Sequence, residues 1–185
     1  MKRAFFFLAA SLLIPSALLG QSQMQVQRAL MAAPPNMRDD ATVLELRPDG
    51  TTAVLRQGAN GLMCWDNRGR RGYNNPLDVQ CTTEANRPRL EQNHEFQAAG
   101  GSDEEIQARF QRSEADGSRA LSEFGSIYYR VQGESMSDFR THTTVAVPFA
   151  TGESLGLPSR GGGGMLWVMQ GGTSSSHLMV GDVGR

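Results

Sequence analysis

The sequence predicts an α+β fold, in which a mainly antiparallel sheet with a short helical insertion forms a single domain. Alternating apolar and polar residues near both ends of the chain predict strands, and Gly-rich turns separate them. A polar stretch of helix-forming residues, about 84–124, lies between the two groups of strands. We therefore divide the chain into a signal peptide (1–22), a flexible lead-in (23–36) and one α+β domain (37–185).

The N-terminus has the pattern of a secretory signal peptide. Two basic residues precede an apolar run over 4–19, and small residues follow it. The run is shorter than the ~20 apolar residues that a membrane-spanning helix needs, which disfavours an uncleaved anchor. We expect a protein secreted to the medium or the periplasm, without a transmembrane anchor, whose mature chain begins near Gln21 or Gln23.

The first strands are expected directly after the lead-in. Residues 42–58 predict a hairpin, because apolar and polar residues alternate on both sides of the turn sequence Pro48-Asp49-Gly50. A third short strand is expected over 62–65. The stretch 66–80 shows no usable period and is rich in Gly, Asn and Arg.

The insertion is expected to hold two surface helices, in 82–101 and 102–117, each closed by glycine. Ser102 and Glu105 have the spacing of a capping box, which starts a helix. Because apolar residues are scarce here, we expect these helices to be weakly anchored. The chain then returns to strands, expected over 126–133, 141–149, 165–170 and 176–183.

Cys64 and Cys81 are the only two cysteines, and they are expected to form a disulfide. An exported chain passes through an oxidising compartment where paired thiols persist as a bridge. Neither a C-x-x-C spacing nor a nearby histidine completes a metal site. We expect the bond to be structural, to join the strand of Cys64 to the start of the helical insertion, and to have Trp65 packed beside it.

The charge balance excludes several classes of function. The chain has 18 basic and 19 acidic residues, which argues against a nucleic-acid-binding protein, because neutralising phosphates needs a basic face. Lys2 is the only lysine, so a P-loop lysine or a lysine Schiff base is excluded from the mature protein. The glycine-rich stretch 161–177 is interpreted as a strand between turns rather than a phosphate cradle. We expect no cofactor.

The three histidines give no recognisable metal or nucleophile motif. No H-E-x-x-H sequence is present, so no metal site is predicted. One enzymatic interpretation stays open. In this alternative the protein is a secreted hydrolase, in which His142 and His177 meet across neighbouring strands and work with a carboxylate such as Asp182.

The other interpretation is a non-enzymatic exported domain that binds a small molecule or an envelope partner. The loop residues Arg68, Arg70, Arg71 and Tyr73 are its candidate binding residues, because Arg and Tyr are favoured at interfaces. A merely solvated loop surface is the alternative for this segment.

Five segments resemble a family of small secreted bacterial proteins of unknown function. The stretch "LRQGANGLMC", followed by a second Cys after Pro-Leu-Asp, is the most specific of them. The resemblance implies a secreted single domain and no particular activity, cofactor or partner. The segments are "ALMAAP", "ATVLEL…DGTTAVLRQGANGLMCW", "PLDVQC", "SIYYRVQGES" and "MLWVMQGGTSSSHLMV".

Overall fold

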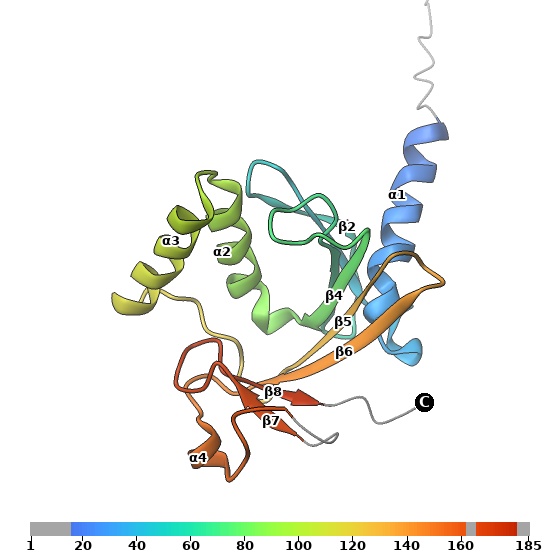
Figure 1. Ribbon diagram of the computed structural model, residues 1–185. Coiled ribbons are helices and arrows are strands. Elements are labelled where there is room, and N and C mark those ends of the chain that lie inside the picture. Colours follow the sequence, from blue (N-terminus) through green and yellow to red (C-terminus); the bar gives the residue numbers. More distant parts are fainter. Residues whose placement is uncertain (1–15, 162–165, 181–185) are drawn as a thin grey trace, which may run out of the picture.

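A single mixed sheet forms the centre of the computed structural model, which describes residues 16–161 and 166–180. Its eight strands are β1 Thr42–Leu46, β2 Thr52–Arg56, β3 Leu62–Asp66, β4 Leu77–Thr83, β5 Ile127–Gly133, β6 Phe139–Ala146, β7 Trp167–Met169 and β8 His177–Val180. The order is β2-β1-β3-β4-β5-β6-β8-β7, and only β1 and β3 run parallel (Figure 1). The predicted α+β class with a mainly antiparallel sheet is confirmed.

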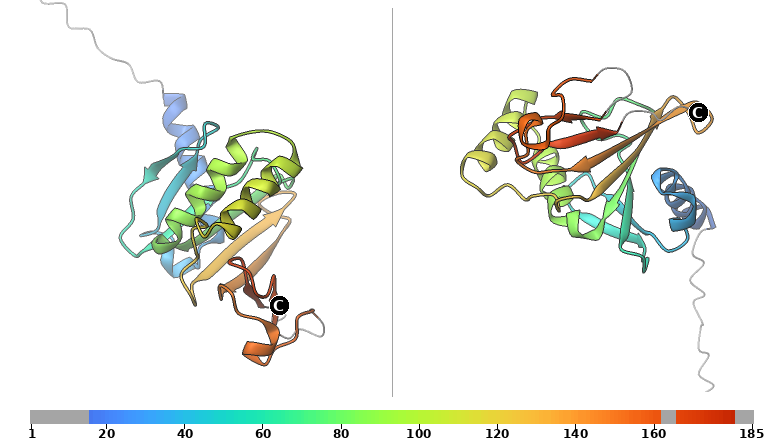
Figure 2. Two further views of the ribbon diagram at one scale, coloured as in Figure 1. Left: turned by 90° about the vertical axis from the view of Figure 1, so that its left-hand side faces the viewer. Right: turned by 90° about the horizontal axis from the view of Figure 1, so that it is seen from below.

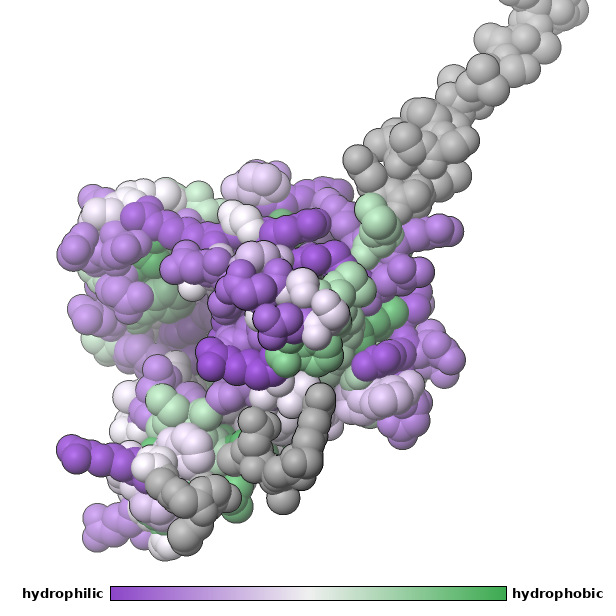
Figure 3. Space-filling model, turned by 45° about the vertical axis from the view of Figure 1, so that its right-hand side comes forward, coloured by the Kyte–Doolittle hydropathy of each residue, from purple (hydrophilic) through white to green (hydrophobic). Residues whose placement is uncertain are grey.

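Helices lie on both faces of this sheet, so they form more than the short insertion that was predicted. The α-helices are α1 Ser16–Ala29, α2 Arg87–Ala98, α3 Asp103–Ala115 and α4 Gly152–Leu155, with 3₁₀ turns η1 Leu30–Ala32, η2 Pro35–Met37 and η3 Glu84–Asn86. Figure 2 shows α2 and α3 on one side of the sheet and α1 on the other. The face in Figure 3 is mostly hydrophilic, with apolar residues gathered beside α1.

The segment 23–36, predicted as a flexible lead-in, is folded against the sheet instead. Ala29, Leu30 and Ala33 are buried and join the apolar residues of β1, β3 and β4 in one core cluster. The small alanine side chains let the end of α1 and η1 approach the strands closely, which is the physical reason for the difference. Residues 1–15 of the predicted signal peptide lie outside the described residues.

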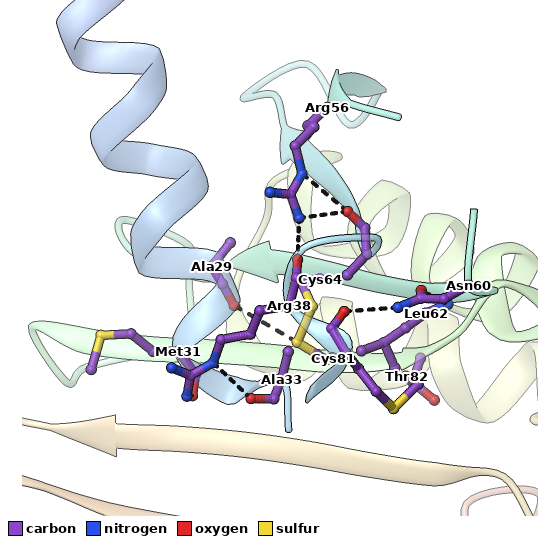
Figure 4. Close-up of a disulfide and its surroundings, with 12 residues drawn as sticks. Ala29, Met31, Ala33, Arg38, Arg56, Asn60, Leu62, Cys64, Cys81 and Thr82 are labelled. Atoms are coloured by element: carbon purple, nitrogen blue, oxygen red, sulfur yellow. Dashed lines mark hydrogen bonds between the residues drawn. A yellow bond between two sulfur atoms is a disulfide. The ribbon is translucent and has the colours of Figure 1, made fainter. Parts of the chain in front are cut away.

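The predicted disulfide between Cys64 and Cys81 is confirmed. The two residues are direct partners in the β3–β4 ladder, with Cα atoms 4.1 Å apart, and both are buried. Figure 4 shows Ala29 and Ala33 beside the bond. The bond therefore joins two neighbouring strands rather than a strand and the helical insertion, because β4 forms in a region where no strand was predicted.

Trp65 does not pack beside the disulfide, so that prediction is wrong. Successive side chains of a strand point to opposite faces of the sheet, which places Cys64 and Trp65 on different sides. Trp65 packs with Leu44, Met63 and Leu90 beneath α2. The sheet therefore has two apolar layers, one around the disulfide under α1 and one under α2.

The helical layer is anchored more firmly than its composition predicted. The capping box between Ser102 and Glu105 is present at the start of α3. The rings of Phe96 and Phe110 meet edge to face, with centroids 5.3 Å apart, and so join α2 to α3. Buried residues of α2, including Leu90 and the polar Arg89, hold this layer on the sheet.

Candidate functional site

A pocket of about 250 Å³ lies where the β1–β2 turn, the β3–β4 loop and the last turns of α2 come together. Its described lining includes four arginines and no acidic residue. We call it the arginine pocket. Its lining consists of Leu46, Arg47, Pro48, Arg68, Gly69, Arg70, Arg71, His94, Gln97 and Ala98.

Arg70 is the most constrained of these arginines. Its two terminal nitrogens donate to Asn67 Oδ1 and Gln97 Oε1, both at 2.5 Å. Its Nε is buried and has no hydrogen-bond partner among the described residues. Burial lowers the pKa of Arg70 from its usual value, since a desolvated guanidinium is less stable as a cation. A charged donor without an acceptor is costly, so an acceptor supplied by a ligand would stabilise it.

The other three arginines of the pocket each contact a carboxylate outside it. Arg71 Nε lies 2.8 Å from Asp103, whereas Arg47 and Arg68 lie 3.5 and 3.8 Å from their acidic partners Glu45 and Asp66. These arginine side chains are about half exposed, and exposed ion pairs contribute at most about 1 kcal/mol. They are therefore held only by weak, exposed ion pairs, to which Arg71 adds a hydrogen bond to the backbone oxygen of Gly101. No described ion pair includes Arg70 itself.

A buried polar network fixes the base of the loop that carries Arg70. Asn67 accepts a hydrogen bond from Trp65 Nε1 at 3.0 Å and donates one to Asp78 Oδ1 at 3.1 Å. Asp78 in turn is ion-paired with Arg130 of β5, whose Nε lies 3.0 Å from Asp78 Oδ1. Because Asn67 also accepts from Arg70, the pocket is connected through this network to the rigid sheet.

His94 forms part of the pocket wall and is buried. Its Nε2 lies 2.7 Å from the backbone oxygen of Arg47, and because a carbonyl only accepts, Nε2 carries the proton. Burial lowers the pKa of His94, and the nearby Arg70 charge lowers it further. His94 is therefore neutral at pH 7, and a bound anion would raise its pKa.

The structure brings three of the four predicted binding residues into one pocket. Arg68, Arg70 and Arg71 all line it, whereas Tyr73 lies behind it with its ring 5.0 Å from the guanidinium carbon of Arg70. Arg47, His94 and Gln97 also line the pocket and were not predicted from the sequence. The i, i+3 spacing of His94 and Gln97 on a helix was a usable signal, since such residues share one face.

The two histidines of the hydrolase alternative do not lie opposite each other in the sheet. His177 is paired with Ala146, four residues along β6 from His142, which separates the two histidines by roughly 13 Å along the strand direction. His177 Nδ1 lies 2.8 Å from the backbone oxygen of Ser175. Asp182 lies outside the described residues. In the part of the chain that the structure describes, no group of three or more metal-ligating side chains is present.

Comparisons with known proteins leave the site to be interpreted from its own geometry. No protein-family model matches the sequence, and neither the curated proteins nor the solved structures give a significant match. Among residues 16–161 and 166–180, no helix is both long and apolar enough to cross a membrane.

Proposed function

We propose that this protein is an exported, non-enzymatic binding protein whose arginine pocket takes a small ligand with a carboxylate or phosphate group. One observation carries the proposal: four guanidinium groups, one from the β1–β2 turn and three from the β3–β4 loop, line one pocket, and one of them has a buried donor without a partner among the described residues. Guanidinium groups match carboxylate and phosphate oxygens with two parallel hydrogen bonds, so this lining favours such anions over neutral ligands.

The size and position of the pocket support a small ligand. Its volume of about 250 Å³ lies just below the range of about 300–1,000 Å³ that is typical for drug-sized molecules. Arg70 and His94 lie inside the pocket, where hydrogen bonds to the protein hold their side chains. Arg68 and Arg71 lie at its solvent-exposed rim. A ligand would therefore meet a fixed inner group and two exposed outer charges.

Anion binding is expected to depend on Arg70. Titration calorimetry with phosphate, citrate and succinate should show binding of at least one of them, and Arg70→Gln should weaken that binding about tenfold or more, since a hydrogen bond between charged groups contributes about 1.5–3 kcal/mol. The matched control is Arg112→Gln, because Arg112 is exposed on α3 and outside the pocket. The control should leave binding unchanged.

A neutral analogue of the ligand and a second measurement show whether the negative charge of the ligand is required for binding. Succinamide should not bind, and added salt should weaken succinate binding, because exposed charges are screened. The pKa of His94, followed by NMR, should rise when the anion binds. Equal binding of succinamide and succinate, or unchanged binding in a folded Arg70→Gln protein, would contradict the proposal. If Arg70→Gln does not fold, Arg68→Gln on the exposed rim takes its place, and it should weaken binding by up to about fivefold because exposed charges contribute at most about 1 kcal/mol.

Export to the periplasm or the medium is the second part of the proposal. The predicted signal peptide and the buried Cys64–Cys81 disulfide support it, because such bonds persist in oxidising compartments. Mass analysis of the exported protein should find an N-terminus near Gln21 or Gln23. An intact Met1 on a membrane-bound product would contradict export with cleavage.

A further inference from the structure

A second pocket lies below the end of α3, where the loop after β6 meets the turn between β7 and β8 (Figure 1). It is wider than the arginine pocket, with a volume of about 590 Å³. One aromatic ring, one carboxylate, one amide and two hydroxyl groups line it. The lining residues are Glu114, Phe149, Gln170, Gly171, Gly172, Thr173 and Ser175.

The backbone of this pocket holds an aromatic ring away from the core. Phe149 and Gln170 have φ angles of 65° and 54°, and among the described residues they are the only non-glycine residues with positive φ. Phe149 N donates to Thr173 O at 2.8 Å, which fixes one loop against the other. The Phe149 side chain is left 56% exposed. Both the left-handed backbone and the exposed ring cost free energy, and both are placed at the same pocket.

A buried polar cluster lies directly behind the serine wall of the pocket. Arg89 and Arg119 are only 6% and 8% exposed, although arginine is rarely buried. Arg89 donates to Ser174 Oγ at 3.0 Å and to Ser175 Oγ at 2.5 Å. Because a guanidinium only donates, the Ser175 hydroxyl keeps its own proton for an acceptor in the pocket.

The charges around the pocket disfavour both ionic classes of ligand. Among the described lining residues Glu114 is the only ionisable one, and its carboxylate would repel an anion. Glu114 lies 3.7 Å from Arg119 Nε and accepts from Ser174, so its charge is already balanced. Arg89 and Arg119 are buried behind the pocket wall, and their guanidinium groups already donate to protein oxygens, so the lining itself presents one ion-paired carboxylate and offers no free charge to either class of ion. Burial lowers the pKa of Arg119 to about 10, and the nearby Arg89 lowers it in the same direction, so Arg119 remains charged at pH 7.

We propose that this pocket binds one ring of a neutral saccharide, at a site separate from the arginine pocket. The Phe149 ring offers a flat apolar surface to the C–H face of a sugar, and Ser175 offers a hydroxyl donor. Glu114 and Gln170 supply an acceptor and an amide for the hydroxyl groups around the ring. A neutral, hydroxyl-rich ring satisfies each of these groups without adding charge.

Saturation-transfer NMR with sugars that share a ring but differ in charge tests the proposal. The full exported protein is mixed in turn with glucose, galactose and N-acetylglucosamine, and with glucuronic acid and glucosamine as the charged counterparts. In the Arg70→Gln protein, in which the anion pocket is disabled, at least one neutral sugar should give a transfer signal, and its charged counterparts should give weaker signals. Failure of every neutral sugar to bind, or stronger binding of the uronic acid or amino sugar to that variant, would overturn the proposal.

Substitution of Phe149, compared with a matched control substitution, tests whether the aromatic ring contacts the sugar. Phe149→Asn removes the ring and keeps a residue that tolerates positive φ, so the signal should be lost while the protein stays folded. Phe124→Asn is the control, because Phe124 is 68% exposed and outside the pocket. A folded Phe149→Asn protein that still binds the sugar would overturn the proposal. If that variant does not fold, ring-proton shifts of Phe149 in the wild-type protein must move on sugar addition, and unmoved shifts would overturn it.

The anion site gives an independent check. Arg70→Gln should leave sugar binding unchanged, because Arg70 does not line this pocket. Loss of sugar binding in a folded Arg70→Gln protein would place the sugar in the arginine pocket and overturn the assignment. The outcome of the succinate experiment therefore neither supports nor contradicts the saccharide site.

Discussion

Loss of the Cys64–Cys81 disulfide is expected to lower the free energy of unfolding by about 3 kcal/mol. The bond closes a loop with a sequence separation of 17, which restricts the unfolded chain. It also lies in the buried cluster under α1, where replacement by smaller side chains leaves a cavity. Urea unfolding of the double variant Cys64→Ala/Cys81→Ala, compared with the oxidised wild type, measures the effect.

Chemical reduction distinguishes the contribution of the covalent bond to the free energy of unfolding from the contribution of the packed sulfur atoms. Wild-type protein unfolded in reducing buffer keeps both side chains and loses only the cross-link, so its midpoint should fall by most of the same amount. The anion affinity of the arginine pocket should change little, because the disulfide lies on the opposite face from Trp65 and α2. An unchanged unfolding midpoint after complete reduction would contradict a stabilising role.

Replacement of Arg130 by methionine is expected to cost about 3 kcal/mol. Asp78 is fully buried, and Arg130 is its ion-pair partner. Removing one partner of a buried pair leaves an uncompensated charge, which is typically destabilising by about 3–5 kcal/mol. We expect the lower end of this range because the Arg130 side chain is partly exposed to solvent. Chemical unfolding of Arg130→Met against Arg112→Met, an exposed arginine, provides the measurement.

A double variant distinguishes an unpaired charge from lost packing. Asp78→Asn/Arg130→Met contains no buried charge at this position and should regain part of the stability lost in Arg130→Met alone. Arg130→Met should also weaken anion binding, because Asp78 orients Asn67 and Asn67 accepts from Arg70. A folded Arg130→Met protein with wild-type stability would show that the network does not hold Asp78 as a charged group.

Much of the fold could be predicted wherever local pattern and tertiary packing agree. The hairpin around Pro48-Asp49-Gly50 and the helix that Ser102 caps formed as expected, since turn and capping chemistry are local. The disulfide could be predicted because only one pairing of two cysteines exists. By contrast, the strand predicted over 141–149 ends at Ala146, because Phe149 adopts positive φ and leaves the sheet.

The parts that could not be predicted depend on distant contacts. Apolar and polar residues alternate in β4, with Val79 and Cys81 on one face of the sheet. The polar residue Asp78 is nevertheless buried, because it forms an ion pair with Arg130, which is 52 residues away in the sequence. The short alanine-rich segment 29–33 has no periodic pattern, and only the opposing sheet explains its burial. The arginine pocket likewise combines three segments, and no single segment holds its pattern.

The direct pairing of Cys64 with Cys81 has a consequence for how the chain reaches its native state. A shift of one residue between β3 and β4 would move every side chain of one strand to the other face and separate the two thiols. Oxidation is therefore efficient only after the correct alignment has formed. In an oxidising compartment the disulfide would therefore form in molecules with the correct β3–β4 register and fix that register covalently. Molecules with a shifted register would keep free thiols and could still rearrange.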